Sequence, residues 1–286
     1  MHRIQAKSIL SSSNGINVYR GCTHGCIYCD SCSTCYGIDH EFTDVAVKEN
    51  APQLLEAALR SKRKRCMIGT GAMSDPYMPL EKELRITRQC LELIKRYDFG
   101  AAVQTKSDLV LRDIDLLSEI NHSTKAVVQM TLTTADDELC RIIEPKVCVT
   151  SRRFEVLCEM KKAGIPTVMW MCPILPFIND TEENILALVD YADRAGCKGI
   201  LSFGIGMTLR DGDRQYYYAA LDRHFPQLKE RYIQRYRDSY ELPSPDVRRL
   251  WRVFTSACEK AGIEYDTDRI FSYLHEFPEN EQLSLF

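Results

Sequence analysis

Short apolar runs alternate with amphipathic stretches along most of this chain, and the runs predict buried strands. The runs cover residues 16–19, 66–69, 101–104, 126–132, 167–171 and 199–203. The stretches between them predict helices at about 50–59, 81–97, 113–120, 136–143, 151–163 and 181–196. Apolar strands that alternate with helices are typical of a parallel sheet covered by helices. Six such units are compatible with an open doubly wound sheet and with a partial barrel.

Polar and glycine-rich segments follow the apolar runs. They lie at residues 69–77, 105–107, 131–134, 172–173 and 204–206. Ligands bind at the carboxyl ends of the strands in both architectures, so we expect these segments to form one site. Two interpretations are open for Lys106. It is either an ordinary solvated lysine on the surface, or a residue at the strand ends whose ammonium group binds an anionic group of a ligand.

The composition fits one large domain, or one domain with a small appendage. The 286 residues are 45% hydrophobic and 27% charged, and no apolar run is long enough to cross a bilayer. Since there is also no signal peptide, we expect a cytoplasmic protein with no membrane partner. The net charge of −3 gives no overall electrostatic preference for nucleic acid.

Three of the 13 cysteines, Cys22, Cys26 and Cys29, stand in one loop at C-x3-C-x2-C spacing. Iron–sulfur clusters are held by thiolates, and four are usual. Three thiolates would leave one iron free to bind another molecule, as catalytic metal sites leave one position open. A structural zinc loop is the alternative, because Cys32 and Cys35 add a further C-x2-C pair.

The cysteine spacing, with Tyr28 just before the third thiol, resembles the radical S-adenosylmethionine (SAM) superfamily. Longer motifs resemble its spore photoproduct lyase subfamily, and they lie at residues 69–77, 105–107, 111–117, 133–136, 144–145, 153 and 164–166. The resemblance implies a partial (β/α)6 TIM-type barrel, a [4Fe-4S] cluster and SAM, which the reduced cluster cleaves to a 5′-deoxyadenosyl radical. It also implies a reaction on DNA thymines and an electron donor such as flavodoxin or ferredoxin.

The resemblance assigns roles to individual positions. The cluster would be held by Cys22, Cys26 and Cys29. The residues that would flank SAM or contact its polar groups are Tyr28, Ser74, Lys106, Thr131 and Arg153. For Arg153 the alternative is a structural ion pair with Glu144 inside the barrel.

One departure from the subfamily concerns the donor of a hydrogen atom. The lyase proper uses a cysteine just before a Thr-Ser-Asp run, and this chain has Ala72 at that place. A thiol quenches a carbon radical because its S–H bond is weak, which alanine cannot do. The cysteines that could substitute are Cys32, Cys35, Cys140 and Cys172.

Residues 207–275 differ in composition from the strand–helix part, residues 1–206, and predict a C-terminal helical extension. Arginines are interleaved with aromatic residues there, as on nucleic-acid surfaces. The alternative is a helical closure of the open barrel edge. A last helix is predicted from Val247 to Ala261.

The tail, residues 276–286, ends in Leu-x-Leu-Phe after an acidic stretch. It resembles the short peptide with which bacterial DNA polymerases and repair enzymes bind the sliding clamp. The partner-binding residues would be Gln282, Leu283, Leu285 and Phe286. The alternative is a terminus that folds back onto its own core.

Two enzymatic functions are compatible with these observations. The first is a radical SAM enzyme that repairs or modifies a DNA base, as spore photoproduct lyase does. The second is a radical SAM enzyme that acts on a small molecule, a peptide or RNA. A zinc-binding structural protein is a third, non-enzymatic function.

Overall fold

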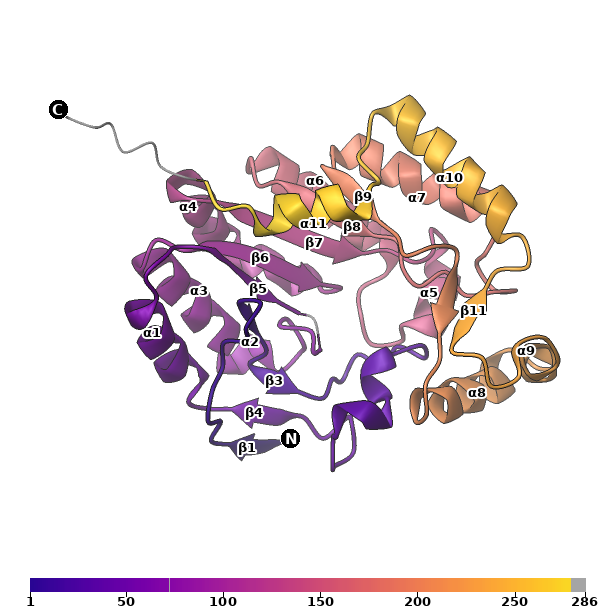
Figure 1. The fold of residues 1–286 in the computed structure, drawn as a ribbon, viewed down its shortest axis with the longest axis horizontal. Coiled ribbons are helices and arrows are strands. Elements are labelled where there is room, and N and C mark those ends of the chain that lie inside the picture. Colours follow the sequence, from indigo (N-terminus) through magenta and orange to yellow (C-terminus); the bar gives the residue numbers. More distant parts are fainter. Residues whose placement is uncertain (72, 279–286) are drawn as a thin grey trace.

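The computed structural model of the chain describes residues 1–71 and 73–278. Its main sheet has six parallel strands in the order β2-β5-β6-β7-β8-β9 (Figure 1). Their bounds are Gly15–Ile16, Met67–Thr70, Gly100–Thr105, Ala126–Thr131, Thr167–Trp170 and Gly199–Leu201. The predicted α/β fold with a partial barrel is confirmed, and the pairing does not close the sheet into a ring within the described residues.

Five helices follow the strands in turn and cover the outer face of the sheet. They are α1 (Ala51–Ser61), α3 (Ile86–Arg96), α4 (Ile114–Ser123), α6 (Thr150–Lys162) and α7 (Glu182–Ala195). Side chains alternate between the two faces of a strand, so every second residue meets these helices. The strand residues in this main core include Ile68, Val103, Val128, Met169 and Ile200. Helix α10 (Val247–Ala261), which the sequence predicted with these bounds, packs on α7.

The inner face of the sheet is covered by a helix that the sequence did not predict. Helix α11 (Thr267–His275) lies across the strands, as Figure 1 shows, and buries Ile270 and Leu274 against them. The strand residues of this second core are Met67, Ala102, Val127, Val168 and Leu201. The helix therefore fills the inner face below the carboxyl ends of the strands and leaves those ends uncovered.

Several local predictions are wrong in the N-terminal part. The apolar pattern predicts no strand before residue 16, but strand β1 (His2–Ile4) pairs with β4 (Ala46–Lys48). The predicted first strand, 16–19, is divided, because β3 (Tyr19–Arg20) leaves the main sheet and joins β4. The predicted helix cap Asn50 instead exchanges two hydrogen bonds with the backbone of Ala6.

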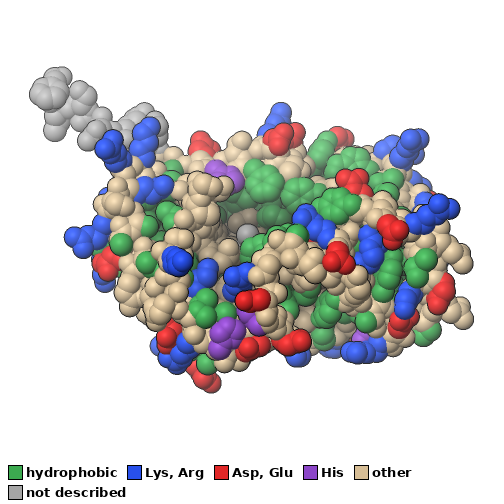
Figure 2. Space-filling model, turned by 60° about the horizontal axis from the view of Figure 1, so that its bottom comes forward, with side chains coloured by type: hydrophobic (Ala, Val, Ile, Leu, Met, Phe, Trp, Pro, Cys, Tyr) green, Lys and Arg blue, Asp and Glu red, His purple; other side chains and the backbone are tan. Residues whose placement is uncertain are grey.

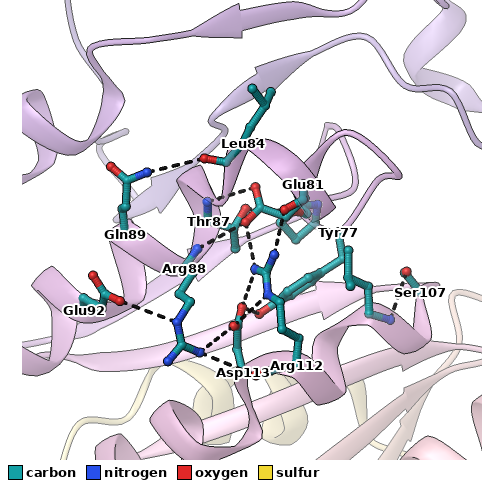
Figure 3. Close-up of polar contacts among 12 residues, drawn as sticks. Tyr77, Glu81, Leu84, Thr87, Arg88, Gln89, Glu92, Ser107, Arg112 and Asp113 are labelled. Atoms are coloured by element: carbon teal, nitrogen blue, oxygen red, sulfur yellow. Dashed lines mark hydrogen bonds and ion pairs between the residues drawn. The ribbon is translucent and has the colours of Figure 1, made fainter.

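The predicted helix over residues 81–97 is broken at Arg85, whose φ of 51° is left-handed. The short helix before the break, α2 (Glu81–Leu84), places the fully buried carboxylate of Glu81 in a charge cluster that Figure 3 shows. We call this set the outer charge cluster: Tyr77, Glu81, Arg88, Arg112 and Asp113. Asp113 is the last residue of the 3₁₀ turn η3 (Asp108–Asp113), which precedes α4.

The outer charge cluster satisfies both of its buried carboxylates. Arg112 contacts Glu81 at 2.8 Å and Asp113 at 2.7 Å. Asp113 also accepts hydrogen bonds from Arg88 at 2.8 Å and from the Tyr77 hydroxyl at 3.0 Å. Buried charges are tolerated when they are paired in this way, so the cluster joins α2, α3 and η3 behind the loop that ends at Tyr77.

The extension consists of β10 (Gly206–Thr208), α8 (Asp213–His224), α9 (Leu228–Tyr236) and β11 (Glu241–Pro243), followed by α10 and α11. Its tyrosines form a third core with residues of the cysteine loop, among them Ile27 and Tyr28. The division of the chain at residue 206 stays a prediction. In the described ranges, no helix combines the length and apolar character needed to cross a bilayer.

Candidate active site

A cavity of about 600 Å³ lies at the carboxyl ends of the strands. It is the hollow near the middle of the face in Figure 2, with hydrophobic side chains along its upper side and Lys and Arg side chains below it. The cysteine loop, the segments after β5 to β9 and the strands β10 and β11 all line it. The prediction that the polar segments after the strands meet in one place is confirmed by this lining.

The cysteine loop places all three spaced thiols in the cavity wall. Burial raises the pKa of Cys22 to about 12 and the pKa of Cys26 well above its ordinary value. A hydrogen bond with the Cys32 side chain lowers the pKa of Cys29 to about 7. Thiols bind metals as thiolates, so loading of the two buried cysteines must release protons.

A single metal ion would need its ligands closer together than these cysteines are. Within residues 1–71 and 73–278, no three His, Cys, Asp or Glu side chains converge closely enough to hold one ion. In a four-iron cluster each thiolate binds a different iron, so the thiols must be spread apart. Three cysteines that line one cavity from a single loop fit such a group.

Asp75 joins the cysteine loop to the end of β6. Its carboxylate accepts hydrogen bonds from Thr105 Oγ1 and from the backbone N–H of Lys106, both at 2.7 Å. It also faces His24 Nδ1 at 3.5 Å, and burial lowers the pKa of that imidazole. No role for Asp75 follows from the sequence alone, although it stands in the Ser-Asp-Pro-Tyr run that carries the family resemblance.

Lys106 lines the cavity with its ammonium group over the Tyr28 ring, 5.8 Å from the ring centroid. Burial opposes its charge, but the nearby Cys26 and Glu144 outweigh burial and raise its pKa, so the amine stays protonated. Among the described residues, no carboxylate forms an ion pair with this ammonium group. A buried cation of this kind suits an anionic group of a ligand.

Arg153 lies behind the cavity wall rather than in it. Its guanidinium is fully buried and pairs with Glu144 at 2.6 Å, which is the structural ion pair that the sequence left open. It also donates to the backbone carbonyl of Thr131 at 3.0 Å. Glu144 in turn accepts a hydrogen bond from the Tyr28 hydroxyl. We call Tyr28, Glu144 and Arg153, together with Lys106, the inner charge cluster.

The remaining wall positions assigned to SAM are Ser74 and Thr131, and both line the cavity. The Ser74 hydroxyl is buried and has no hydrogen-bond partner among the described residues. Buried hydroxyl groups are usually satisfied, so this one is available to a ligand. Gly71 is required nearby, because its φ is +100° and a Cβ would lie 2.1 Å from the Gln104 carbonyl oxygen.

The four thiols considered as hydrogen-atom donors lie in different places. Cys172, directly after β8, lines the cavity, and burial raises its pKa to about 12. Cys140 is fully buried beside Glu144 and Arg153 and does not reach the wall. Cys32 and Cys35 do not line the cavity: the Cys32 side chain is hydrogen-bonded to Cys29, and Arg210 is 3.5 Å from the Cys35 sulfur.

The loop after the cysteines is ordered by the extension. It forms two 3₁₀ turns, η1 (Asp30–Cys32) and η2 (Thr34–Tyr36), where the sequence showed no periodicity. Arg210 lies 3.4 Å from Asp30, and its guanidinium packs over the rings of Tyr36 and Tyr240. The extension therefore fixes the position of the cysteine loop.

Sequence reasoning missed the aromatic side of the cavity. Trp170 and Phe203 line it at the ends of β8 and β9. The sequence counted both as interior residues of apolar strands. Their position is the sequence feature that could have indicated a place in the cavity wall, because each stands near the carboxyl end of its apolar run.

Two curated relatives are proteins described as uncharacterized. One from Mycobacterium tuberculosis is 29% identical over 248 residues, which cover 83% of this chain and 71% of the relative. One from Methanocaldococcus jannaschii is 34% identical over 173 residues, which cover 59% of this chain and 63% of the relative.

Solved structures of spore photoproduct lyase share the fold. One superposes with a TM-score of 0.67 at 14% identity and covers 91% of this chain and 78% of that chain. Another, with bound AdoMet and dinucleoside spore photoproduct, has a TM-score of 0.66 at 13% identity with the same coverage. The family comparison matches the Radical SAM superfamily over residues 16–192, which is more than half of the chain. This chain therefore belongs to the radical SAM superfamily, whose members use a [4Fe-4S] cluster and SAM.

Proposed function

We propose that this radical SAM enzyme acts on DNA and repairs or modifies a base, in the manner of spore photoproduct lyase. The observation that carries the proposal is the cavity itself. It is bounded on one side by the cysteine loop and on the other by the arginine-rich extension, in a fold shared with a lyase that has been solved with bound dinucleoside spore photoproduct. The second function, on a small molecule, a peptide or RNA, becomes an outcome of the test below.

The residues that would hold the cofactors follow from the cavity wall. Cys22, Cys26 and Cys29 would bind the cluster, which with SAM supplies a 5′-deoxyadenosyl radical that abstracts hydrogen from a substrate. The Lys106 ammonium would bind the SAM carboxylate, and the Ser74 hydroxyl would gain the partner that it lacks. Tyr28 and Thr131 would complete the wall.

Arg153 would act indirectly, by holding other residues of the site in place. Its guanidinium contacts Glu144, Cys140 and the carbonyls of Thr131 and Cys148, and Arg153 does not line the cavity. We therefore assign Arg153 as a positioning residue, which fixes the end of β7 and the Glu144 carboxylate under Tyr28. Direct contact with SAM, which the family resemblance implied for Arg153, is not part of this proposal.

Cys172 is the thiol that we assign to return a hydrogen atom. It is the one candidate donor whose side chain lines the cavity. Its S–H bond would break as a C–H bond forms on the substrate radical, leaving a thiyl radical. One electron from a flavodoxin or ferredoxin and one proton would restore the thiol. Because its pKa is raised to about 12, the thiol keeps its hydrogen at neutral pH.

The test is anaerobic SAM cleavage. Protein reconstituted with iron and sulfide is reduced with dithionite, and 5′-deoxyadenosine is measured with and without ultraviolet-irradiated DNA. Stimulation by irradiated DNA is the expected result. Cleavage that DNA leaves unchanged would move the substrate to a small molecule, a peptide or RNA. Absence of cleavage with a fully loaded cluster would contradict the enzymatic function.

Recruitment by the sliding clamp stays a proposal. The residues Gln282, Leu283, Leu285 and Phe286, like Ala72, lie outside the described residues. Binding of a purified bacterial clamp to the full chain and to a Leu285→Ala, Phe286→Ala double variant would decide it.

A further inference from the structure

Three aromatic rings meet at one end of the cavity, and they come from distant parts of the chain. Trp170 ends β8, Phe203 follows β9, and Phe271 belongs to α11. The ring centroids of Trp170 and Phe203 are 5.9 Å apart, and those of Phe203 and Phe271 are 6.2 Å apart with nearly parallel planes. Trp170 and Phe271 meet edge to face at 6.2 Å. We call these three residues the aromatic platform.

The platform rests on fixed supports. Trp170 donates a hydrogen bond from Nε1 to the buried Gln129 at 2.9 Å. Phe271 packs on the inner core of the sheet together with Trp170. Phe203 therefore lies on two side chains that are held from behind, and its remaining surface is turned outward.

Phe203 is unusually exposed for a large apolar side chain. Its exposed fraction is 64%, the highest of any large hydrophobic residue in the described part of the chain. Single exposed apolar residues are common on surfaces. Phe203 differs because it lines the cavity, stacks on Phe271 and meets Trp170 edge to face, so its free surface faces the space where a substrate would bind.

The cavity has two chemically different ends. The thiols, Ser74 and Lys106 form a polar end, which suits the polar groups of SAM. Two platform residues, Trp170 and Phe203, form an apolar end together with Ile205 and Met207. A volume of about 600 Å³ is that of a small-molecule site. A macromolecule could therefore insert only one group, and enzymes that modify a base extrude that base from its strand.

The surroundings of the platform favour a nucleic acid. Residues 207–262, which include the strands β10 and β11 at the cavity, contain 11 Lys and Arg against eight Asp and Glu. The chain as a whole has a net charge of −3. This segment is therefore more basic than the chain as a whole, and none of its Lys or Arg residues lines the cavity, so its positive charge suits a phosphate backbone outside the cavity while a base lies inside it.

We propose that the aromatic platform binds the substrate by stacking a nucleobase on Phe203. The inference rests on the proposed function and adds to it the place and the mode of binding. Stacking on an aromatic ring tolerates any base, because every base has a π face. The platform would hold the base, and the polar end would determine which atom reacts.

The experiment measures binding of single-stranded DNA to the reconstituted, SAM-loaded full chain. The probes are a labelled oligothymidine and an abasic oligonucleotide of the same length, followed by fluorescence anisotropy. Phe203→Ala should weaken binding of oligothymidine roughly 5- to 100-fold and leave the abasic probe unchanged. Phe203→Tyr keeps a ring and should bind nearly as the natural chain does. Leu186→Ala, which truncates an exposed residue on α7, is the matched control.

A second measurement, of tryptophan fluorescence, shows whether the base binds beside Trp170. The chain has two tryptophans, so Trp251→Phe leaves Trp170 as the sole indole. In that background, oligothymidine should quench Trp170 fluorescence more than the abasic probe does, and Phe203→Ala should reduce the difference. The thermal unfolding midpoint of each variant shows that it is folded.

Failure of the platform and failure of the proposed function give different results. If DNA stimulates SAM cleavage but Phe203→Ala binds oligothymidine as tightly as the natural chain does, the platform is wrong and the DNA function stands. If the natural chain binds neither probe and irradiated DNA stimulates nothing, both are wrong. If an aromatic peptide quenches Trp170 fluorescence and oligothymidine does not, the proposed binding of a nucleobase is wrong and a peptide substrate is favoured.

Discussion

The outer and inner charge clusters are made of the same residue types but differ in one respect. Both bury carboxylates completely against arginine and a tyrosine hydroxyl. In the outer cluster, Glu81 and Asp113 are paired with Arg88 and Arg112, and no member of the cluster lines the candidate active site. In the inner cluster, Arg153 forms an ion pair with Glu144. Lys106 lines the cavity and forms no ion pair within the described residues.

The difference distinguishes structural from functional charge. Burying a charge is unfavourable unless partners compensate it, so a fully paired cluster needs only the fold. An ammonium group held half-buried without a carboxylate needs a further explanation, and a bound anion provides it. Perturbation of the outer cluster should therefore change stability alone, whereas perturbation of the inner cluster should change binding as well.

The largest effect is expected at the thiols that the inner cluster surrounds. Cys26→Ala removes one of three proposed ligands, and we expect SAM cleavage and the brown absorbance of the cluster to fall to background. Circular dichroism should show an unchanged fold. Cys158→Ala, on α6 outside the cavity, is the control. A variant that retains the cluster would show that Cys26 is not a ligand.

Arg153→Met should produce the next largest effect. It leaves the Glu144 carboxylate buried without its partner, which costs about 3–5 kcal/mol of the free energy of unfolding. Urea denaturation measures this loss. The folded fraction should also bind SAM more weakly, because Thr131 and Tyr28 lose their support. Weakened stability with unchanged SAM binding would make Arg153 purely structural.

Lys106→Met tests the unpaired charge directly. We expect the dissociation constant for SAM to rise about 10- to 100-fold, since a charge-assisted hydrogen bond is worth about 1.5–3 kcal/mol. Equilibrium dialysis of the reconstituted protein measures it. The urea midpoint should hardly move, in contrast to Arg153→Met. Lys162→Met, at an exposed position on α6, should have no effect on either quantity.

Asp113→Asn should act on stability only. The amide keeps one acceptor but loses the charge that binds Arg88 and Arg112, so the free energy of unfolding should fall by about 1–3 kcal/mol. SAM binding and cleavage per folded molecule should match the natural chain. A loss of SAM affinity comparable to that of Lys106→Met would remove the distinction between the two clusters.

The smallest effect concerns the reactivity of Cys172. Only the thiolate reacts with iodoacetamide, and burial raises the pKa of this thiol to about 12. Since the neutral thiol is favoured below that pH, its alkylation at pH 8 should be at least about tenfold slower than that of an exposed cysteine. Its rate should keep rising with pH toward 12, where an ordinary thiol levels off near 9. Mass spectrometry of the modified peptide provides the rate, and a plateau near pH 9 would contradict the burial argument.

The sequence predicts those features that depend on short spacings. The strand over 126–132 and the helix from Val247 to Ala261 have clear local periods, and the cysteine loop carries its motif within eight residues. The segments after the strands could be assigned to one site because parallel strands share one carboxyl edge.

The features that could not be predicted depend on contacts between distant residues. Nothing local shows that residues 16–19 divide between two sheets, or that Arg85 adopts a left-handed backbone inside a helical pattern. The burial of Arg153 is set by Glu144 and by the end of β7. The aromatic platform joins residues 170, 203 and 271, whose proximity only the fold creates.

Helix α11 also affects how the chain is made. The cysteine loop and all six strands of the main sheet precede this helix in the sequence, so they leave the ribosome before it does. Until α11 emerges, the inner face of the sheet has no apolar cover and the platform lacks Phe271. A nascent chain at that stage therefore exposes an apolar sheet surface. A chaperone that shields apolar segments would bind this surface until the last helix docks.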